Sequence, residues 1–362
     1  MDVDVGTLLR MRLSAQGLTR RLGDTPAGVV RGLCALQAQD LRQSEWAIGS
    51  RVPGCTVEDV WAAYSAGEVV RSWPMRGTLF ATTPADLRLL LSLTAGRQVA
   101  GSATRHRQLG LTDDDRDRAR DVARSVLAGT SATGGLGRAE LLAAVVEAGV
   151  DTSGQRGAHL IGRLAHEAVL CLGPPHARTP GGPTQGLVLL DEWAPGQAPE
   201  DRPAAVAELV RRYLAGHGPA TERDLAWWSG LTLTEVRQGF AAVRAELTEV
   251  RCGDGVLWTL GDPPDPEPGG VLALAGFDEL VLGYPDRSHG LPAEYASVVV
   301  PGQNGVFFPV VVDDGRVVGT WKRVVARGRA AVVVSPFETV PDQVRAGYER
   351  AAAAVLAFRG EG

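Results

Sequence analysis

Two helices followed by a β-hairpin are predicted by residues 221–260, TERDLAWWSGLTLTEVRQGFAAVRAELTEVRCGDGVLWTL. The first helix opens at Thr221, and apolar residues at helical spacing indicate the second over residues 234–247. Two strand-like runs then flank Gly253-Asp254-Gly255, a sequence typical of a tight hairpin turn. With a further helix expected over residues 203–215, this segment has the element order of a winged helix.

The same order is predicted twice more toward the N-terminus. Residues 5–66 read as helices, and the strand-like runs Val69–Trp73 and Thr78–Thr82 follow them. Residues 112–170 read as three helices, the third over 155–170, and two apolar runs after them pair across a Pro/Gly-rich loop. Similar helix openings about 80 residues apart favour a repeated unit, although three unrelated helical layers remain the alternative.

The last part of the chain is predicted to be rich in strands. Residues 261–268 form a Pro-rich linker ahead of it, and Asp313-Asp314-Gly315 is a tight turn within it. A final helix is expected from about Pro341 to Phe358. The expected strands are Val271–Ala275, Ala296–Val300, Val306–Val312, Arg316–Val325 and Ala330–Val334.

These patterns predict a mainly helical α+β protein with three tandem winged-helix units and a small β-rich C-terminal domain. The first winged helix would also contain the motif Gln37-Ala38-Gln39 described below. The predicted domains are residues 1–110, 111–195 and 196–262 for the winged helices, and 270–362 for the last domain.

Composition narrows the class of protein further. The 362 residues are 44% hydrophobic and 22% charged, which is typical of globular proteins. No apolar run is long enough to span a membrane, and the N-terminus lacks a signal pattern, so a cytoplasmic protein is expected. The net charge of -5 means that any DNA binding must come from local basic patches.

Several kinds of chemistry lack their sequence signatures. We find no phosphate-binding loop, no nucleophile elbow and no zinc-protease motif. The six histidines and four cysteines show no metal-ligand or redox spacing, so neither metal nor cofactor is expected. Lys322 is the only lysine, which leaves it and the N-terminal amine as the candidates for amine-based covalent catalysis.

Basic residues gather near the predicted hairpins. The segment 316–329 contains five basic residues and no acid, with Trp321 among them. On a hairpin, such residues suit contacts to DNA phosphates with an apolar wedge in a groove, but a solvated strand face beside a core tryptophan is equally compatible. The predicted DNA-binding residues are Arg71, Arg76, Arg316, Trp321, Lys322, Arg323 and Arg327.

The stretch Leu33–Asp40, LCALQAQD, reads as an apolar helix that ends in two amides and a carboxylate. Positions i and i+2 do not share a helical face, so Gln37 and Gln39 converge only if the helix ends or distorts there. By residue chemistry alone, this is also what an ordinary polar helix end looks like.

The sequence resembles the winged-helix bacterial DNA glycosylases of the AlkZ/YcaQ type. The matching strings, in order along nearly the whole chain, are LLRMRLSAQGL, LCALQAQDLRQSEWAIGSRV, VVRSWPMRGTLFATT, DLAWWSGL, FDELVLGYPDRS and VVDDGRVVGTWKR. Gln37-Ala38-Gln39 looks like the family's catalytic Gln-apolar-Gln signature. It is closest to the AlkZ branch, the crosslink-unhooking glycosylases of Streptomyces, because the YcaQ branch ends this motif in Asp.

The resemblance implies hydrolysis of the N-glycosidic bond of alkylated purines in double-stranded DNA. It also implies the unhooking of interstrand crosslinks joined through purine N7, as self-resistance to a DNA-alkylating natural product. An N7-alkylated purine is cationic and leaves readily, so the side-chain carbonyls of Gln37 and Gln39 need only orient water and stabilise developing charge. Asp40 is a lesser candidate for the base.

Two other readings of the sequence remain open. Three winged helices also suit a transcription regulator that reads DNA through residues 155–168 and 234–245, although the second helix offers few side chains for this. Alternatively, a binding protein could shield lesions or drugs with a pocket of tryptophans. The candidates for that pocket are Trp46, Trp61, Trp73, Trp227 and Trp228. In each case we expect a monomer, associated with the nucleoid when bound to DNA.

Overall fold

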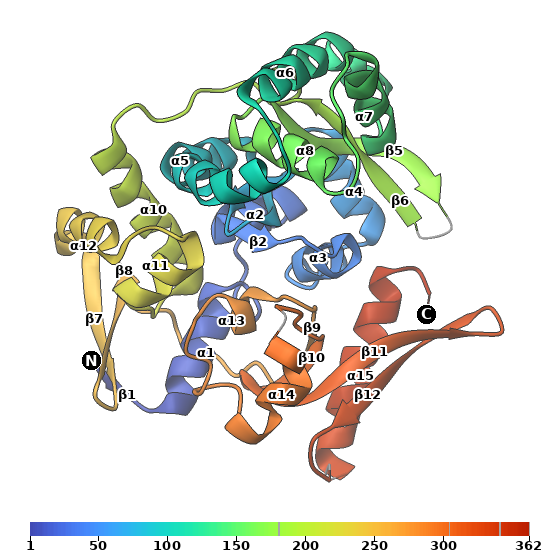
Figure 1. Cartoon of the computed structure of the whole chain (residues 1–362). Helices are drawn as coiled ribbons and strands as arrows, with labels where there is room; N and C mark the ends of the chain where they lie inside the picture. The colour runs from blue at the N-terminus through green and yellow to red at the C-terminus, as the bar shows by residue number, and fades with distance from the viewer. Residues whose placement is uncertain (180–181, 304, 340–341, 362) are drawn as a thin grey trace. The chain divides into compact units, whose positions relative to one another are not determined.

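The computed structural model describes residues 1–179, 182–303, 305–339 and 342–361. The chain forms two compact units: unit 1 is Met1–Val60 with Val206–Gly362, and unit 2 is Trp61–Ala205. Both units contain helices and strands, so the predicted mixed α+β class is confirmed (Figure 1). The four domains predicted from the sequence divide the chain at other places, and that division remains a prediction.

Polar residues set the starts of the N-terminal helices. The bounds are α1 Val5–Ala15, α2 Pro26–Leu33, α3 Leu41–Gly49 and α4 Val57–Ser65, with strand β2 Ala35–Gln37 between α2 and α3. Asp4 Oδ1 accepts from the backbone N–H of Thr7 at 2.7 Å, and Thr25 Oγ1 accepts from that of Gly28 at 3.1 Å. These bonds satisfy N–H groups that have no partner inside a helix.

The three helices and hairpin predicted over residues 203–260 are confirmed as elements. Their bounds are α10 Arg202–His217, α11 Glu222–Ser229, α12 Leu233–Ala242, β7 Leu247–Cys252 and β8 Gly255–Leu260. Thr221 and Asp224 cap α11 reciprocally: Thr221 Oγ1 accepts from Asp224 N at 3.1 Å, and Asp224 Oδ2 accepts from Thr221 N at 2.8 Å. Strand β1, Asp2–Val3, adds to β7 in parallel, so the N-terminus belongs to this sheet.

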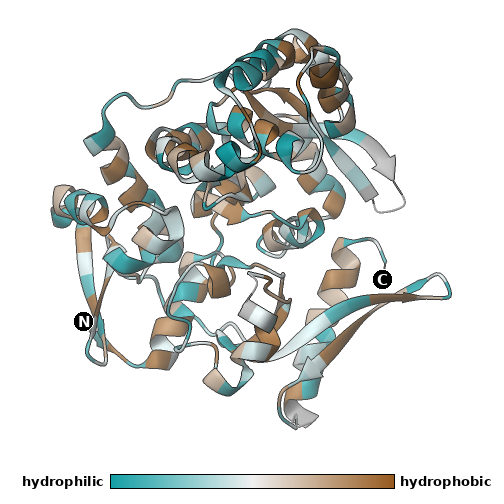
Figure 2. Ribbon diagram, in the orientation of Figure 1, coloured by the Kyte–Doolittle hydropathy of each residue, from teal (hydrophilic) through white to brown (hydrophobic). Residues whose placement is uncertain are grey.

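An antiparallel sheet in the order β12-β11-β10-β9 forms the C-terminal part of unit 1. Its bounds are β9 Val271–Leu274, β10 Val310–Asp313, β11 Arg316–Ala326 and β12 Arg329–Pro336, and helix α15 is Asp342–Phe358. Asp314 and Gly315 make the predicted two-residue turn with φ of 47° and 84°, the backbone that such hairpins require. Helix α15 packs on β9 and β12. Figure 2 shows hydrophobic residues midway along the β11–β12 hairpin and hydrophilic ones at its tip.

Two of the strand predictions in this region were wrong or too long. Residues 296–300 were expected to be a strand, but helix α14, Ala296–Val299, forms there directly after a 3-10 turn. Val299 is fully buried in the core, so tertiary packing outweighs the strand preference of valine. The strand expected from Val306 begins only at Val310, after Pro309, which has no N–H to give to a ladder. The expected first residue of the last helix, Pro341, lies outside the described residues.

Unit 2 pairs its strands in the order β4-β3-β5-β6, accompanied by helices α5 to α9. The strand bounds are β3 Val70–Met75, β4 Thr78–Thr82, β5 Leu170–Thr179 and β6 Gly182–Leu189; the helices are α5 Pro84–Gln108, α6 Asp113–Leu127, α7 Arg138–Glu147, α8 Arg156–His166 and α9 Leu190–Trp193. The helices and the hairpin predicted here are confirmed, but α8 stops four residues before Leu170 (Figure 1). Ala168, with φ of 57°, breaks the helix and starts the turn into β5.

A buried ion pair ties the N-terminal helices of unit 1 to the segment after β9. The guanidinium of Arg51 bonds both carboxylate oxygens of Asp278 at 2.9 Å, and both side chains are fully buried. Arg51 also donates to the carbonyl oxygens of Gln16 at 2.8 Å and Ala47 at 2.6 Å. Because every charged atom has a partner, the desolvation cost of the pair is offset by its hydrogen bonds.

Replacing Arg51 with methionine tests this pair. The variant leaves Asp278 buried without its counter-ion, so we expect the free energy of unfolding to fall by about 3–5 kcal/mol. Urea unfolding followed by tryptophan fluorescence measures the change. Arg21→Met is the control, because the Arg21–Asp24 pair is exposed and should contribute little. Equal unfolding midpoints for the two variants would contradict this account.

Candidate active site

The Gln37-Ala38-Gln39 motif does not end a helix, which corrects the expectation from sequence: Gln37 is the last residue of a strand, and the chain bends at Gln39. Helix α2 stops at Leu33, and Cys34 turns the chain with φ of 65° before β2 begins at Ala35. Alternate side chains of an extended backbone project to the same side, which a helix does not allow for positions i and i+2. The strand ends at Gln37, so it sets the direction of the Gln37 side chain, and the bend that follows sets that of Gln39.

Burial differs along the motif. Gln37 is 7% exposed and Ala38 is fully buried, whereas Gln39 is exposed where the chain bends after β2. The backbone N–H of Gln37 donates to Glu279 Oε1 at 3.0 Å, so the strand is held by a side chain 242 positions away. A non-glycine residue at positive φ is uncommon, and the surrounding core must hold Cys34 in place.

Asp40 ends the motif and caps the next helix. Its Oδ1 accepts from the backbone N–H groups of Arg42 at 3.0 Å and Gln43 at 3.2 Å. The first turn of α3 is thereby fixed to the end of the motif. The capping geometry accounts for an aspartate here without a catalytic role.

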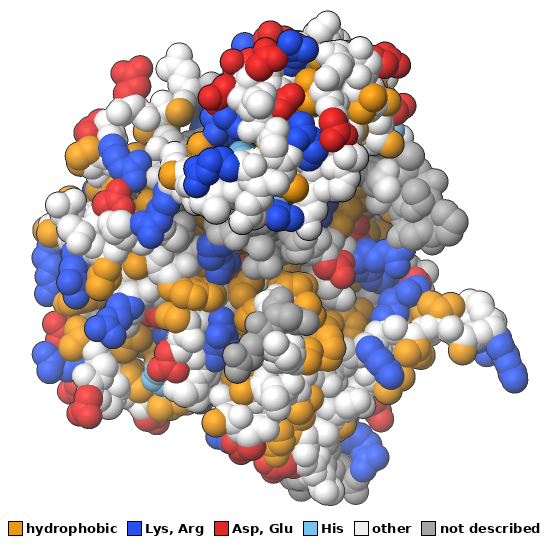
Figure 3. Space-filling model, in the orientation of Figure 1, with side chains coloured by type: hydrophobic (Ala, Val, Ile, Leu, Met, Phe, Trp, Pro, Cys, Tyr) orange, Lys and Arg blue, Asp and Glu red, His pale blue; other side chains and the backbone are white. Residues whose placement is uncertain are grey.

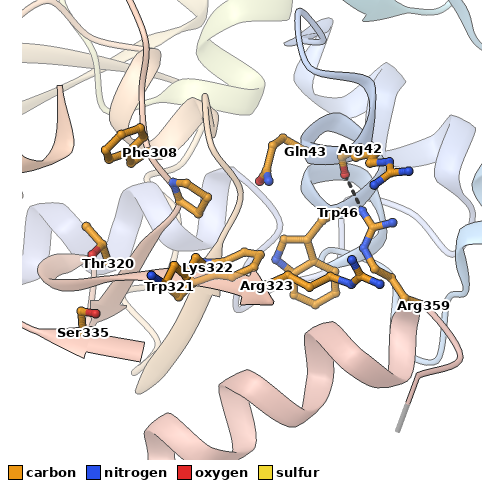
Figure 4. Close-up of a pocket in the computed structure, with 11 residues that line it drawn as sticks. Arg42, Gln43, Trp46, Phe308, Thr320, Trp321, Lys322, Arg323, Ser335 and Arg359 are labelled. Atoms are coloured by element: carbon orange, nitrogen blue, oxygen red, sulfur yellow. Dashed lines mark hydrogen bonds between the residues drawn. The ribbon is translucent and has the colours of Figure 1, made fainter. Parts of the chain in front are cut away.

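A cavity of about 610 Å³ lies between α3 and the C-terminal sheet of unit 1 (Figure 4). Both of its tryptophans have satisfied indole N–H groups: Trp46 Nε1 donates to Ala273 O at 2.8 Å and Trp321 Nε1 to Leu274 O at 2.7 Å. The cavity is lined by Arg42, Gln43, Trp46, Phe308, Pro309, Thr320, Trp321, Lys322, Arg323, Ser335 and Arg359. Gln37 and Gln39 are not lining residues, but the helix that contributes Arg42 starts two residues after Gln39.

Four basic side chains give this cavity a positive character. Arg42 and Lys322 are exposed. Arg323 is half-buried against Glu361, with Nε donating to Oε2 at 2.6 Å, and this bond lowers the pKa of the Glu361 carboxyl. Arg359 Nη2 donates to the backbone oxygen of Arg42 at 2.8 Å, which Figure 4 shows as a dashed line. Such a surface attracts an anion.

Of the predicted DNA-binding residues on the β11–β12 hairpin, Trp321, Lys322 and Arg323 line the cavity, whereas Arg316 and Arg327 lie away from it. Arg327 sits in the exposed two-residue turn at the tip with φ of 50°, and Arg316 starts β11 away from this cavity. Figure 3 shows basic side chains along this hairpin to its tip. Trp321 is only 6% exposed and packs on the sheet, so it lines the cavity and does not project as a wedge.

The two predicted DNA-binding residues of unit 2 differ in accessibility. Arg71 is 9% exposed, and its Nη1 donates to Gln185 Oε1 at 3.3 Å inside the β3–β5–β6 region. Arg76 lies in the turn of the β3–β4 hairpin with φ of 54°, and its guanidinium lies 5.3 Å from the centroid of the Phe80 ring. Both residues belong to the β3–β4 hairpin, but the Arg71 side chain is buried, whereas that of Arg76 is partly exposed.

Sequence reasoning missed the residues that surround the motif and the cavity. Glu279 lies inside the string FDEL, which carried the resemblance without an assigned role, and Trp228 was considered only for a drug-binding tryptophan pocket. Arg42 and Gln43 lie three and four residues after Gln39. No local pattern indicates Arg359, because α15 brings it to α3 from the end of the chain.

Two further findings concern other kinds of site. Within the described ranges, no cluster of three or more His, Cys, Asp or Glu residues is arranged to hold a metal ion. Two histidine rings that lie near each other, His106 and His159, make an edge-to-face contact with their centroids 5.2 Å apart. None of the helices in these ranges has the length and apolar character that crossing a bilayer requires.

Comparison with known proteins identifies the class. The chain matches the family model "DNA glycosylase AlkZ-like" over residues 30–358 and belongs to this family, as the resemblance implied. It is therefore an enzyme of the DNA glycosylase class that acts in DNA repair.

The particular relative is a Streptomyces protein. The chain is 28% identical over 347 residues to an "Interstrand DNA cross-link repair glycosylase" of Streptomyces sahachiroi, covering 92% of this chain and 90% of that protein. Among solved structures it is similar to Streptomyces sahachiroi DNA glycosylase AlkZ, with a TM-score of 0.79 and 27% identity over 99% of this chain and 98% of that one. This identity marks a relative within the family and not the same protein.

Replacing Asp40 with asparagine separates capping from catalysis. Asparagine caps helices as well as aspartate does but cannot act as a base, so we expect wild-type stability and wild-type glycosylase activity. Asp40→Ala removes the cap and should lower the free energy of unfolding by about 1 kcal/mol. A large loss of base release in Asp40→Asn, with the fold intact, would instead make Asp40 the base.

Proposed function

We propose that this chain is a monofunctional glycosylase that hydrolyses the N-glycosidic bond of N7-alkylated purines in double-stranded DNA. Interstrand crosslinks joined through N7 are included among its substrates. One observation carries the proposal: Gln37 ends a strand that Glu279 holds, and Gln39 follows it at an exposed bend just before the Asp40 cap. The crosslink-repair name of the Streptomyces relative supports it.

The chemistry suits neutral amides. An N7-alkylated purine carries a positive charge and leaves without protonation, so a strong general acid is unnecessary. The remaining tasks are to place a water at the anomeric carbon and to stabilise positive charge on the sugar. The carbonyl oxygens of Gln37 and Gln39 accept from the water and direct negative partial charge at the sugar. Since an amide is a poor base, the enzyme should be slow and should act poorly on uncharged lesions.

The cavity and hairpin of unit 1 are proposed to hold the DNA backbone. Arg42 and Lys322 offer exposed cations beside α3, and Arg327 extends the positive charge to the hairpin tip. Contacts of this kind position a duplex without reading its sequence. Arg316 and Arg76 are proposed as outlying phosphate contacts, whereas Arg71, Trp321 and Arg323 act by shaping the surface around them.

The finer architecture is also a proposal. The three helix-and-hairpin segments, residues 1–110, 111–195 and 196–262, are taken as winged-helix units, and residues 270–362 as the β-rich C-terminal domain. We propose further that the enzyme works as a monomer, without a cofactor, and protects its producer against a DNA-alkylating natural product. The names of the relatives favour neither a transcription regulator nor a drug-binding protein. Three of the five tryptophans considered for a drug-binding pocket are at least nine-tenths buried, so they offer little surface to a ligand.

The first test uses a labelled duplex that contains one 7-methylguanine. Gln37→Ala and Gln39→Ala should each lower the rate of base release by about 10²-fold, because water is no longer oriented, while the affinity for DNA stays unchanged. Mild alkali reveals the abasic sites. Borohydride added to the wild-type reaction should trap no covalent adduct, since Lys322 is not a nucleophile. Release at the wild-type rate by both variants would contradict the proposal, and an adduct lost in Lys322→Ala would contradict monofunctional hydrolysis.

The second test concerns the backbone contacts. Lys322→Ala and Arg327→Ala should each lower the slope of log affinity against log salt by about 1, because each removes one phosphate contact. Titration of a fluorescent duplex between low and moderate salt measures this slope. Arg211→Ala is the control, because Glu246 already binds that guanidinium at 2.7 Å. Equal slopes for all four proteins would exclude the hairpin as a phosphate-binding element.

A further inference from the structure

The buried carboxylate of Glu279 accepts hydrogen bonds from three parts of unit 1. Its Oε1 accepts from the backbone N–H of Gln37 at 3.0 Å. Its Oε2 accepts from Trp228 Nε1 at 2.9 Å and lies 3.2 Å from His217 Nε2. We infer that Glu279 is a positioning residue, which fixes the Gln37 strand so that the Gln37 amide is presented to the substrate. This inference rests on the proposed function.

A carboxylate is the side chain that this place requires. A carboxylate only accepts hydrogen bonds, and the backbone amide and the indole each have only an N–H to offer. With its hydrogen on Nε2, His217 completes a set of three donors around the Glu279 carboxylate. Glu279 is 1% exposed and His217 is fully buried, so no bulk water competes for these bonds.

Aromatic packing holds His217 against the carboxylate. Its ring stacks on Tyr213 with centroids 4.6 Å apart and planes within 9°. The Tyr213 hydroxyl donates to Gly283 O at 3.0 Å, one helical turn after Glu279. A Cβ on Gly283 would lie 2.9 Å from His217 Cδ2 and 2.6 Å from Glu279 O, so only glycine fits there.

Tyr284 extends the network toward the N-terminal helix. Its hydroxyl donates to His217 O at 2.7 Å and accepts from Gln16 Nε2 at 3.2 Å. The Arg12 guanidinium lies over its ring, 3.8 Å from the centroid. Glu279 is thus fixed on the sides of α1, α10 and α11 before it reaches the motif, which makes it a rigid anchor.

Glu279 binds the backbone of Gln37 and not its side chain, as a residue that positions Gln37 must. Glu279 binds the backbone N–H, so the side-chain amide of Gln37 remains available for water and sugar. The strand has only three residues and follows the turn at Cys34, and the bond to Glu279 holds its last residue, Gln37. Small displacements of a catalytic group are costly in rate, which is why a rigid anchor at this N–H matters.

Glu279→Gln tests the inference. The amide keeps the size of the side chain but turns one oxygen into an N–H₂ group, so at least one of the three donors loses its acceptor. We expect the single-turnover rate of 7-methylguanine release to fall at least about tenfold, with the dissociation constant for the duplex unchanged. Hydrogen exchange of the Gln37 amide should become faster.

Two further variants keep the result interpretable. Asp278→Asn is the matched control: the neighbouring carboxylate is equally buried, but it binds Arg51 and not the motif. It should lower the unfolding temperature and leave the single-turnover rate unchanged. If Glu279→Gln does not fold, Trp228→Phe takes its place, because it removes one donor and leaves Glu279 and Gln37 intact. A several-fold slower rate at unchanged affinity is expected for it.

The outcomes distinguish this inference from the proposed function. If the wild type releases no base beyond spontaneous depurination, the proposed function itself fails. If the wild type is active and Glu279→Gln, or Trp228→Phe in its place, keeps the wild-type rate, Glu279 has no positioning role while the function stands. A rate that falls equally in Asp278→Asn would show that stability alone is responsible, and would also overturn the inference.

Discussion

The hydrogen bond between the Glu279 carboxylate and the Gln37 backbone is the constraint on which the site depends. A buried anion is expensive to desolvate, and it persists here because three N–H groups surround it. The donors come from segments near residues 37, 217 and 228, so the site forms only when these segments have packed together. The buried ion pair of Arg51 with Asp278, one residue earlier, stabilises the fold, and among the described residues neither side chain is hydrogen-bonded to the motif.

Under the proposed function, this arrangement explains how a weak catalytic group can be sufficient. Neutral amides supply orientation and dipoles and no proton transfer, so their effect depends on how accurately they are held. The strand, the anchor at Gln37 and the cap at Asp40 hold the backbone on both sides of Ala38. Gln39 is exposed, and we propose that the positive cavity next to α3 receives the DNA strand that carries the lesion.

Much of the fold was predictable because its signals are local. Thr221 and the turn at Asp314-Gly315 act through bonds within a few residues, and the elements they begin or connect were placed correctly. The site was less predictable because its geometry comes from distant contacts. A positive φ at Cys34 converts a predicted helix end into a strand, and Val299 becomes helical to fill a core. Nothing near Gln37 in the sequence indicates that Glu279 will bind it.

The most direct test of the account is a double-mutant cycle between Gln37 and Glu279 on the single-turnover rate of base release. If Glu279 acts through Gln37, then Glu279→Gln should slow the wild type strongly but change the rate of Gln37→Ala by no more than about twofold. The two losses would then be far from additive in free energy. Independent, multiplicative losses in the double variant, each as large as in the single variants, would contradict the account.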